Sequence, residues 1–346
     1  MNTSSLWTTT DFSLYNESDY VDEYEDEGCD NSEPVKFGQI FNPVFFSIVV
    51  VLSVFGNILV VAVLVKYENL KSITNAFILN LAISDLLFTA GLPFWVYYHK
   101  SGAWTLGETA CKAVNFVFYV GFYSSGFLLI LMTIHRYIAV VSPLSDFVST
   151  KGLYCILAPV VVWLVSIIAA VPYFIFTQVN EVGFCGYVPN SAAVSFWGIY
   201  QQIALFILTS LVFVLCYSQI IWRLLRPTGQ GRKSKPIKVI FTLMVVFFLG
   251  WAPYNAVILL RSHQFSDGDC EVFKTLNYAL SICRLGAFSH CCLNPVFYVF
   301  VGVKFKNHLM RFVKDLGRGS SRRSSSSVRS RQGRVMSVTS GEEMSL

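Results

Sequence analysis

The stretch His290-Cys291-Cys292-Leu293-Asn294-Pro295-Val296-Phe297-Tyr298 lies inside an apolar run, residues 276–300, that is long enough to cross a membrane as a helix. Pro295 removes a backbone donor and clashes with the preceding turn, and an unpaired Asn294 in hydrocarbon is costly. Such a helix is stable in lipid only where neighbouring helices or water satisfy the freed polar groups. The run therefore predicts a bent helix in a bundle that can repack, which indicates a switch rather than an anchor.

The composition of the whole chain is that of a membrane protein. Hydrophobic residues make up 54% and charged residues 14% of its 346 residues, and the mean hydropathy is +0.55. Seven apolar stretches have the length of about 20 residues that a membrane helix needs. They cover residues 41–66, 73–98, 109–141, 153–176, 194–225, 237–260 and 276–300. Polar residues interrupt the third stretch, as expected of a central helix that touches protein on all sides. The sequence predicts an all-α membrane protein, a seven-transmembrane-helix bundle over residues 41–300.

Lysine and arginine are concentrated in alternate loops of this predicted bundle. They occur near 66–71, 136–151 and 223–238 and again from 304 onward, and the loops between are poor in both. Because positively charged loops stay in the cytoplasm, the N-terminus is expected outside and the C-terminus inside. Residues 1–34 hold no apolar core of signal-peptide length, so the first span is expected to act as the insertion signal.

Residues 1–40 are expected to form a disordered acidic extracellular arm. They contain a block of Asp and Glu with no Lys or Arg before Lys36, and such a block is too polar and too like-charged to fold alone. The arm is then either a solvated spacer or a segment that becomes ordered on a cationic partner. Tyrosines among the acids favour the second interpretation, because their sulfation would sharpen the selection of a basic ligand. The ligand-binding candidates in the arm are Tyr15, Tyr20 and Tyr24.

Glycosylation sequons and cysteines mark the external segments. Asn2-Thr3-Ser4 and Asn16-Glu17-Ser18 predict glycosylation of Asn2 and Asn16. Four of the nine cysteines lie in or beside external segments and can oxidise, in three pairings between which the residues alone do not decide. These four are Cys29, Cys111, Cys185 and Cys270.

Metal binding is the alternative use of the intramembrane residues His290, Cys291 and Cys292. Adjacent residues on a helix point in different directions. Free cysteine in a helix is usually a small hydrophobic side chain. The sequence therefore disfavours a metal ion at this position.

Motifs in five of the expected spans carry a family resemblance. They are Gly56-Asn57, Leu81-Ala82-Ile83-Ser84-Asp85, Trp163, Trp251-Ala252-Pro253-Tyr254 and Asn294-Pro295-Val296-Phe297-Tyr298. With these motifs the chain resembles the class A G-protein-coupled receptors from span one to Leu309. Trp95 after Pro93, the run His290 to Pro295 and the paired external cysteines are similar to the chemokine receptors. Residues 132–137, 140–145 and 298–305 most closely resemble the XC group of that family.

The resemblance implies a multi-pass receptor of the plasma membrane. Such a receptor binds an extracellular basic chemokine, here a lymphotactin-like one, and activates a heterotrimeric G protein, expected to be of Gi type, to drive cell migration. The flexible N-terminus of the chemokine is expected to enter between spans two, three, six and seven. The ligand-binding candidates there are Trp95, Phe118, Tyr254 and Arg284. The family also implies the disulfides Cys111–Cys185 and Cys29–Cys270.

The same resemblance implies an activation switch and an ion site. The residues expected to repack are Arg136, Tyr217, Trp251, Pro253, Asn294, Pro295 and Tyr298. Asp85, Ser125 and Asn294 resemble an allosteric sodium site, because a lone carboxylate in mid-membrane needs a cation, a proton or donors. No other cofactor is expected. Outward movement of the sixth span would expose Arg136 to a Gα subunit.

Several residues depart from the family pattern, and three of them bear on the switch, the ion site and the pocket. His135 stands where the class has an acid before Arg136, so the usual ion pair cannot form and Arg136 is expected to be less restrained. His135 is then either tolerated at the interface or a sign of lost coupling. Gly121 replaces an Asn ligand of the ion site, which predicts weak sodium affinity. Arg284 replaces an acid of the pocket and inverts its charge.

The C-terminal region is expected to lie on and below the inner membrane surface. Residues 301–316 place Phe305, Leu309 and Phe312 on one face with basic residues around them, which predicts a short interfacial helix on anionic lipid. Residues 317–346 form a disordered tail of serines among arginines. Receptor kinases would phosphorylate such a tail and create an arrestin site. The alternative is a basic solvated tail without regulation.

An atypical receptor, a transporter and an enzyme are the alternatives to a signalling receptor. The nearer rival is an atypical receptor that takes up chemokine with arrestin and without G-protein signalling, which His135 leaves open. A seven-span transporter is remote, because the chain shows no repeated halves and has only Asp85 and Arg284 as clear charges deep in its spans. No enzyme activity is expected because no catalytic constellation falls at a consistent membrane depth, and no nucleic-acid partner is expected.

Overall fold

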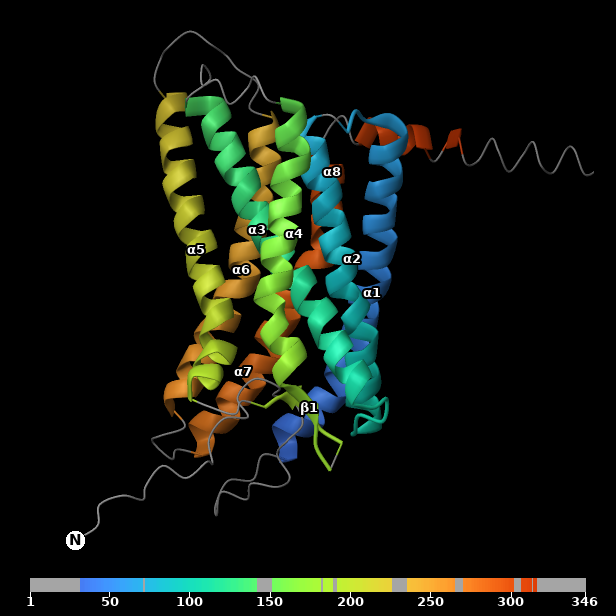
Figure 1. Cartoon of the computed structure of the whole chain (residues 1–346), viewed down its shortest axis with the longest axis vertical. Helices are drawn as coiled ribbons and strands as arrows, with labels where there is room; N and C mark the ends of the chain where they lie inside the picture. The colour runs from blue at the N-terminus through green and yellow to red at the C-terminus, as the bar shows by residue number, and fades with distance from the viewer. Residues whose placement is uncertain are drawn as a thin grey trace, which may run out of the picture.

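The structure is a computed structural model that describes residues 32–315 apart from 71, 142–150, 182, 189–191, 226–234, 265–269, 302–305 and 313. Its long helices run side by side in one bundle (Figure 1). The helices are α1 Ser32–Tyr67, α2 Ile73–Ser101, α3 Glu108–Val141, α4 Lys151–Phe176, α5 Ala192–Leu225, α6 Lys235–Gln264, α7 Cys270–Phe288 and α8 His290–Val301.

The predicted seven-span bundle is confirmed, with one span built from two helices. Within the described residues six helices, α1 to α6, are long and apolar enough to cross a membrane. The predicted seventh span, residues 276–300, is divided between α7 and α8. The first helix also differs from its prediction, because it begins at Ser32 rather than at 41.

The seventh span is interrupted at Ser289, between α7 and α8. Pro295 has no N–H to donate to the carbonyl of Cys291, four residues earlier. That carbonyl instead accepts a hydrogen bond from Asn57 Nδ2 of α1 at 2.9 Å. Pro295 also lies against Gly56, where an added Cβ would come within 2.9 Å of it. The polar group freed by the proline is therefore satisfied by a neighbouring helix, as the sequence predicts.

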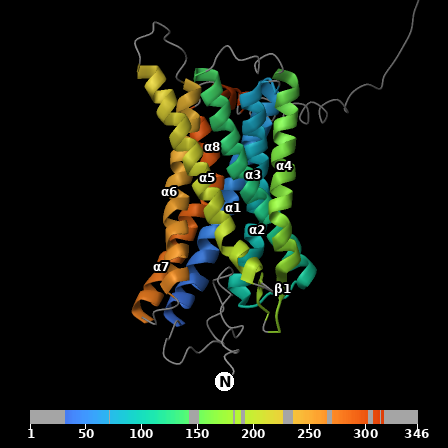
Figure 2. The same cartoon turned by 60° about the vertical axis from the view of Figure 1, so that its left-hand side comes forward.

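The segment between α4 and α5 forms a short antiparallel hairpin that the helical prediction does not include. Strand β1, Thr177–Val179, pairs with β2, Cys185–Tyr187. Gly183 in the turn has φ of 80°, a conformation that glycine adopts without steric cost, and its N–H donates to Asn180 O at 3.1 Å. The hairpin lies at the end of the bundle where α4 ends and α5 begins (Figure 2). By the distribution of basic loops this is the extracellular end.

Apolar side chains of the bundle face both its interior and its surroundings. The helix α3 runs through the middle of the bundle (Figures 1 and 2), and 67% of its most apolar window is buried, more than in any of the other five spans. The prediction of a central third helix is thus confirmed. Outward faces carry large exposed apolar side chains, such as Phe55 at 70% and Ile168 at 69% exposed. Such exposure fits hydrocarbon better than water.

A short helix follows the bundle at its inner end. Residues 306–312 and 314–315 are helical and lie across the inner end of α1 (Figure 1). Tyr67 of α1 stacks on His308, with ring centroids 5.7 Å apart, and donates a hydrogen bond to Asp315 Oδ2 at 2.6 Å. The contacts with α1 therefore fix where the predicted interfacial helix lies.

Candidate functional site

The three residues predicted to share an ion site lie together inside the bundle. Asp85 of α2 is fully buried. Its Oδ1 accepts a hydrogen bond from Ser125 Oγ of α3 at 3.2 Å, and its Oδ2 accepts one from Asn294 Nδ2 of α8 at 2.8 Å. One carboxylate therefore connects three helices.

The polar network continues from Asp85 to the first helix. Thr89 Oγ1 donates to Asp85 O at 2.6 Å and lies 2.6 Å from Ser53 Oγ. Asn57 Nδ2 donates to Ser53 O at 3.0 Å and to Cys291 O at 2.9 Å. These groups are buried, so each hydrogen bond is made in a low dielectric, and the network connects Asp85 with both the first helix and the interrupted seventh span.

The donor set around Asp85 fits a sodium ion. The carboxylate of Asp85 and the hydroxyl of Ser125 supply hard oxygen ligands of the kind that such cations take, whereas Asn294 presents its Nδ2 donor to the carboxylate. Gly121 adds no ligand, as the sequence indicates, and the structure gives the reason. An added Cβ at Gly121 would lie 2.3 Å from Phe88 N, because the backbones of α2 and α3 touch at this level. A larger residue at position 121 would force the two helices apart.

His290, Cys291 and Cys292 do not converge on one point. Nδ1 of His290 lies 2.7 Å from the carbonyl oxygen of residue 287. The thiols of Cys291 and Cys292 donate to the carbonyls of residues 288 and 289 at 3.2 and 3.1 Å. In the described part of the chain, no three His, Cys, Asp or Glu side chains are grouped to hold a metal ion.

An aromatic cluster surrounds Trp251 of α6. The centroid of its ring lies 4.8 Å from that of Phe122 of α3, 5.5 Å from His290 and 5.8 Å from Tyr254. Trp251 is buried, and Pro253 interrupts the hydrogen bonding of α6 two residues later. In a close-packed cluster, displacement of Trp251 shifts side chains of α3, α6 and α8 together.

Arg136, near the inner end of α3, is held by a hydroxyl group instead of an acid. Its Nη2 donates to Thr74 Oγ1 of α2 at 2.6 Å. The adjacent His135 packs edge-on against Phe77, with ring centroids 5.9 Å apart. Thr74 is therefore a restraint on Arg136 that the sequence does not predict. Tyr217 of α5 is buried near Arg136 and lies close enough to act on it electrostatically.

The four ligand-binding candidates in the spans divide into two groups. Phe118 and Tyr254 both contact Phe288 of α7, with ring centroids 5.4 and 6.2 Å from it. Arg284, one turn earlier on α7, is 9% exposed. Trp95 belongs to a different group, because it packs on the residues around a disulfide. The sequence thus predicts one cluster where the structure has two.

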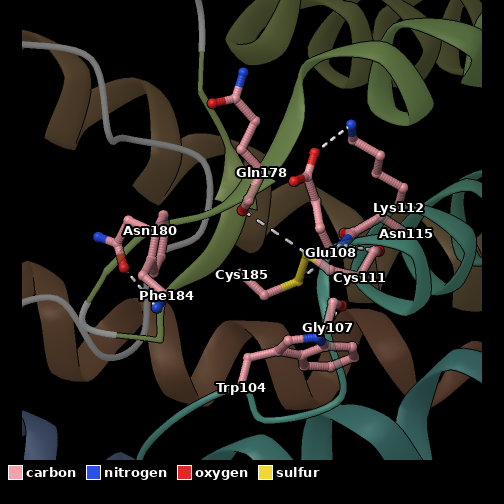
Figure 3. The surroundings of a disulfide bond; sticks show 10 residues. All are labelled: Trp104, Gly107, Glu108, Cys111, Lys112, Asn115, Gln178, Asn180, Phe184 and Cys185. Atoms are coloured by element: carbon pink, nitrogen blue, oxygen red, sulfur yellow. Dashed lines mark hydrogen bonds and ion pairs between the residues drawn. A yellow bond between two sulfur atoms is a disulfide. The ribbon is translucent and has the colours of Figure 1, made fainter.

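A disulfide joins α3 to the hairpin, as predicted (Figure 3). The Cα atoms of Cys111 and Cys185 are 5.9 Å apart. Asn115 Nδ2 donates to Cys111 O at 3.0 Å and lies 3.5 Å from Cys185 Sγ. Trp104 Nε1 donates to Gly107 O at 2.8 Å, which orders the loop before α3. The outer end of α3 and the hairpin therefore form one unit.

Several predicted positions fall outside the described residues. These positions are Asn2, Tyr15, Asn16, Tyr20, Tyr24, Cys29 and the side chain of Tyr298. Cys270 is disulfide-bonded, and Cys29 is its predicted partner. The interpretations given for them stay predictions.

The structure adds residues that the sequence reasoning missed. Tyr119 of α3 stacks on Tyr173 of α4 at 3.3 Å, and Gln201 and Gln202 of α5 are buried. Burial raises the pKa of the Tyr187 phenol in β2 to about 12. The glutamines do leave a signal in the sequence, because two adjacent amides in an otherwise apolar span are costly at membrane depth.

The chain is similar to known proteins over most of its length. A family model described as "7 transmembrane receptor (rhodopsin family)" matches residues 56–298. The "Chemokine XC receptor 1" of Homo sapiens is 41% identical over 293 residues, which is 84% of this chain and 86% of the relative. The protein of that name in Mus musculus is 42% identical over 285 residues, 81% of this chain and 85% of the relative.

Proposed function

Because the chain belongs to the rhodopsin family of seven-transmembrane receptors and to the chemokine receptors within it, we propose that it binds an XC-type, lymphotactin-like chemokine. On binding, it activates a heterotrimeric G protein of Gi type and so drives cell migration. It is a multi-pass receptor of the plasma membrane and not an enzyme. The similarity to the two XC receptors supports the ligand class, and the buried contacts through Trp251 and the Asp85 network support the switch.

Ligand capture takes place in two steps. A basic chemokine first meets the acidic arm by long-range attraction, which raises its rate of association. Its flexible N-terminus then enters the outer half of the bundle near Phe118, Tyr254 and Arg284. The disulfide between α3 and the hairpin holds these two elements together at this entrance.

Activation is a shift between two packings of the bundle. Ligand shifts the balance only if it binds one packing more tightly than the other. Pressure on Tyr254 and Phe288 moves Trp251, which contacts both, and Trp251 repacks against Phe122 of α3. Release of Arg136 from Thr74 at the inner end then opens a site for the C-terminal helix of Gα.

Four further partners belong to this proposal: a sodium ion, anionic lipid, receptor kinases and arrestin. Asp85, Ser125 and Asn294 would hold a sodium ion, whose charge balances the buried carboxylate and favours the packing in which these residues are close. The short helix at 306–315 would rest on anionic lipid. Receptor kinases would phosphorylate the serine-rich tail and recruit arrestin.

A panel of chemokines tests the proposal in membranes that contain the full chain. Ligand-stimulated nucleotide exchange on Gα and recruitment of arrestin are measured for the parent chain and for Arg136→Ala at matched surface expression. We expect at least one chemokine to stimulate exchange in the parent, and Arg136→Ala to bind it without exchange. A parent chain that binds no chemokine would refute the proposal.

An atypical scavenging receptor is the second candidate. The observation in its favour is the absence of an acid at position 135, so that Arg136 donates to the hydroxyl of Thr74 instead of to a carboxylate. If a chemokine binds and arrestin recruitment or uptake follows without nucleotide exchange, this second assignment replaces the first.

A further inference from the structure

The outer half of α5 carries two buried glutamines that the proposed mechanism does not use. Gly198 lies against strand β2 of the hairpin, and Leu205 lies against Gly126 of α3. Gln201 and Gln202 are three or four residues from both of these contacts, and residues at that spacing share one face of a helix. Both glutamines therefore lie on the face of α5 that is turned to the hairpin and α3.

The amide groups of these glutamines are not satisfied by the protein. Gln201 is 8% and Gln202 is 4% exposed. Oε1 and Nε2 of Gln201 and Nε2 of Gln202 have no hydrogen-bond partner among the described residues. Other polar groups on α5 differ, since Thr209 and Ser210 each donate a hydroxyl to the carbonyl four residues earlier at 2.7 Å. Unpaired amides are costly at membrane depth, which indicates a partner from outside the chain.

The surroundings of the glutamines suit a peptide. Tyr123 of α3 lies one turn before Gly126, and the two glutamines lie one turn before Leu205, which contacts Gly126. Tyr123 is therefore at the same depth as the glutamines. Tyr119, a further turn outward, stacks on Tyr173. Tyr254 of α6 and Arg284 of α7 lie close enough to Tyr119 to act on it electrostatically. The region therefore offers aromatic walls, two neutral amides and one cation.

A primary amide presents a donor and an acceptor side by side, which complements the N–H and C=O of a peptide group. We propose that Gln201 and Gln202 form a subsite for the main chain of an extended peptide, with Arg284 selecting the charge of that segment. This inference rests on the proposed function and deepens it, because it assigns the recognition of the chemokine N-terminus at α5 to main-chain hydrogen bonds. A site that needs hydrogen bonds discriminates more strongly than an apolar pocket of the same size.

The test pairs changes in the ligand with changes in the receptor. The ligand is the chemokine that binds the parent chain in the panel above, made by chemical synthesis with one N-terminal peptide bond at a time replaced by an ester. Each ester removes one N–H and leaves every side chain in place. The receptor variants are Gln201→Met and Gln202→Met, which keep the length of the side chain and lose the amide. Ser210→Ala is the matched control, because its hydroxyl is bonded within α5.

We expect at least one ester to weaken binding to the parent roughly 10-fold. The same ester should weaken binding to one of the Met variants much less, because the glutamine that accepts from the replaced N–H is already missing there. Ser210→Ala should show the full ester effect. Equal ester effects in the parent and in both Met variants would overturn the inference, as would parent-like affinity in both variants. If a Met variant does not reach the cell surface, Gln→Asn, which withdraws the amide by one methylene, is measured in the same way. A parent chain that binds no chemokine refutes the proposed function instead.

Discussion

Arg136 is restrained by a residue that no local pattern connects to it. Thr74 lies 62 positions away in the sequence, on a different helix, and its hydroxyl meets the guanidinium only after α2 and α3 have packed. The grouping of Ser125 and Asn294 with Asp85 was predictable from the family resemblance, and their hydrogen bonds satisfy the need of a buried carboxylate for donors. No such requirement singles out a threonine. A hydroxyl group also binds a guanidinium less strongly than a carboxylate does.

Basal activity should depend on this hydroxyl. Thr74→Val removes the acceptor of Arg136 and should raise ligand-free nucleotide exchange about 5-fold, since a partly hydrated contact of this kind contributes about 1 kcal/mol. His135→Asp restores the acid of the class and should lower basal exchange by a similar factor while ligand-driven activation persists. Exchange is measured at matched surface expression, with Thr275→Val as control because its hydroxyl is bonded within α7. Parent-like basal exchange in Thr74→Val would contradict the role of Thr74.

The charge of Arg284 should matter more for signalling than for binding. Arg284→Glu inverts a buried charge that, in the proposed function, meets the inserted part of the ligand, so the maximal response should fall at least 10-fold while total ligand binding changes less. Arg284→Lys keeps the charge and should retain part of the response. Binding and nucleotide exchange are compared in the same membranes. Normal maximal response in Arg284→Glu would exclude this role.

The helices were more predictable from the sequence than their interruptions. Apolar length alone defines a membrane helix, so the six spans α1 to α6 follow from composition. The break at Ser289 has no local signal of its own, and the donor that satisfies the carbonyl freed by Pro295 comes from Asn57 of another helix. The hairpin was missed for a different reason. Strands of three residues are too short to show the alternation that predicts a strand.

Removal of the donor at Asn57 should destabilise the seventh span. Asn57→Leu leaves the Cys291 carbonyl with a weaker contact to Ser53 at 3.4 Å, and a buried unsatisfied carbonyl costs about 1–3 kcal/mol. The melting temperature of the purified receptor in detergent should fall by several degrees. Asn307→Ala, an exposed amide in the short helix, is the control. An unchanged melting temperature for Asn57→Leu would show that another group satisfies the carbonyl.

At the scale of the whole molecule, charge is distributed along the membrane normal. A net charge of +5 results from an acidic N-terminal region and basic inner loops and tail. Fields from such regions extend about 8 Å into solvent at physiological ionic strength, so they act on an approaching ligand before contact. These fields affect how fast the ligand meets the receptor, whereas the buried contacts of the bundle determine how strongly the bound ligand activates it.

Neutralisation of the arm should therefore slow association. Replacement of Asp19, Asp22, Glu23, Glu25 and Asp26 by their amides should lower the association rate constant of the chemokine about 10-fold at low salt and flatten its dependence on ionic strength. The dissociation rate should change much less. Rates are measured by surface-based kinetics over a salt series, with Glu271→Gln, an exposed external acid on α7, as control. Parent-like association rates would argue against electrostatic capture by the arm.

The close contact between Gly121 of α3 and Phe88 of α2 makes a pivot point about which α3 can tilt. With the backbones of α2 and α3 in touch, α3 can tilt at this level but cannot be pushed toward α2. At 1.5 Å per residue, the part of α3 from Gly121 out to Cys111 is about 15 Å long, and the part from Gly121 inward to Arg136 is about 22 Å long. A ligand that moves the hairpin by 1 Å moves Cys111 with it through the disulfide, and the inner end then swings about 1.5 Å in the opposite direction. If that swing is away from α2 and the side chains keep their conformations, the 2.6 Å hydrogen bond from Arg136 to Thr74 is lengthened beyond hydrogen-bond range.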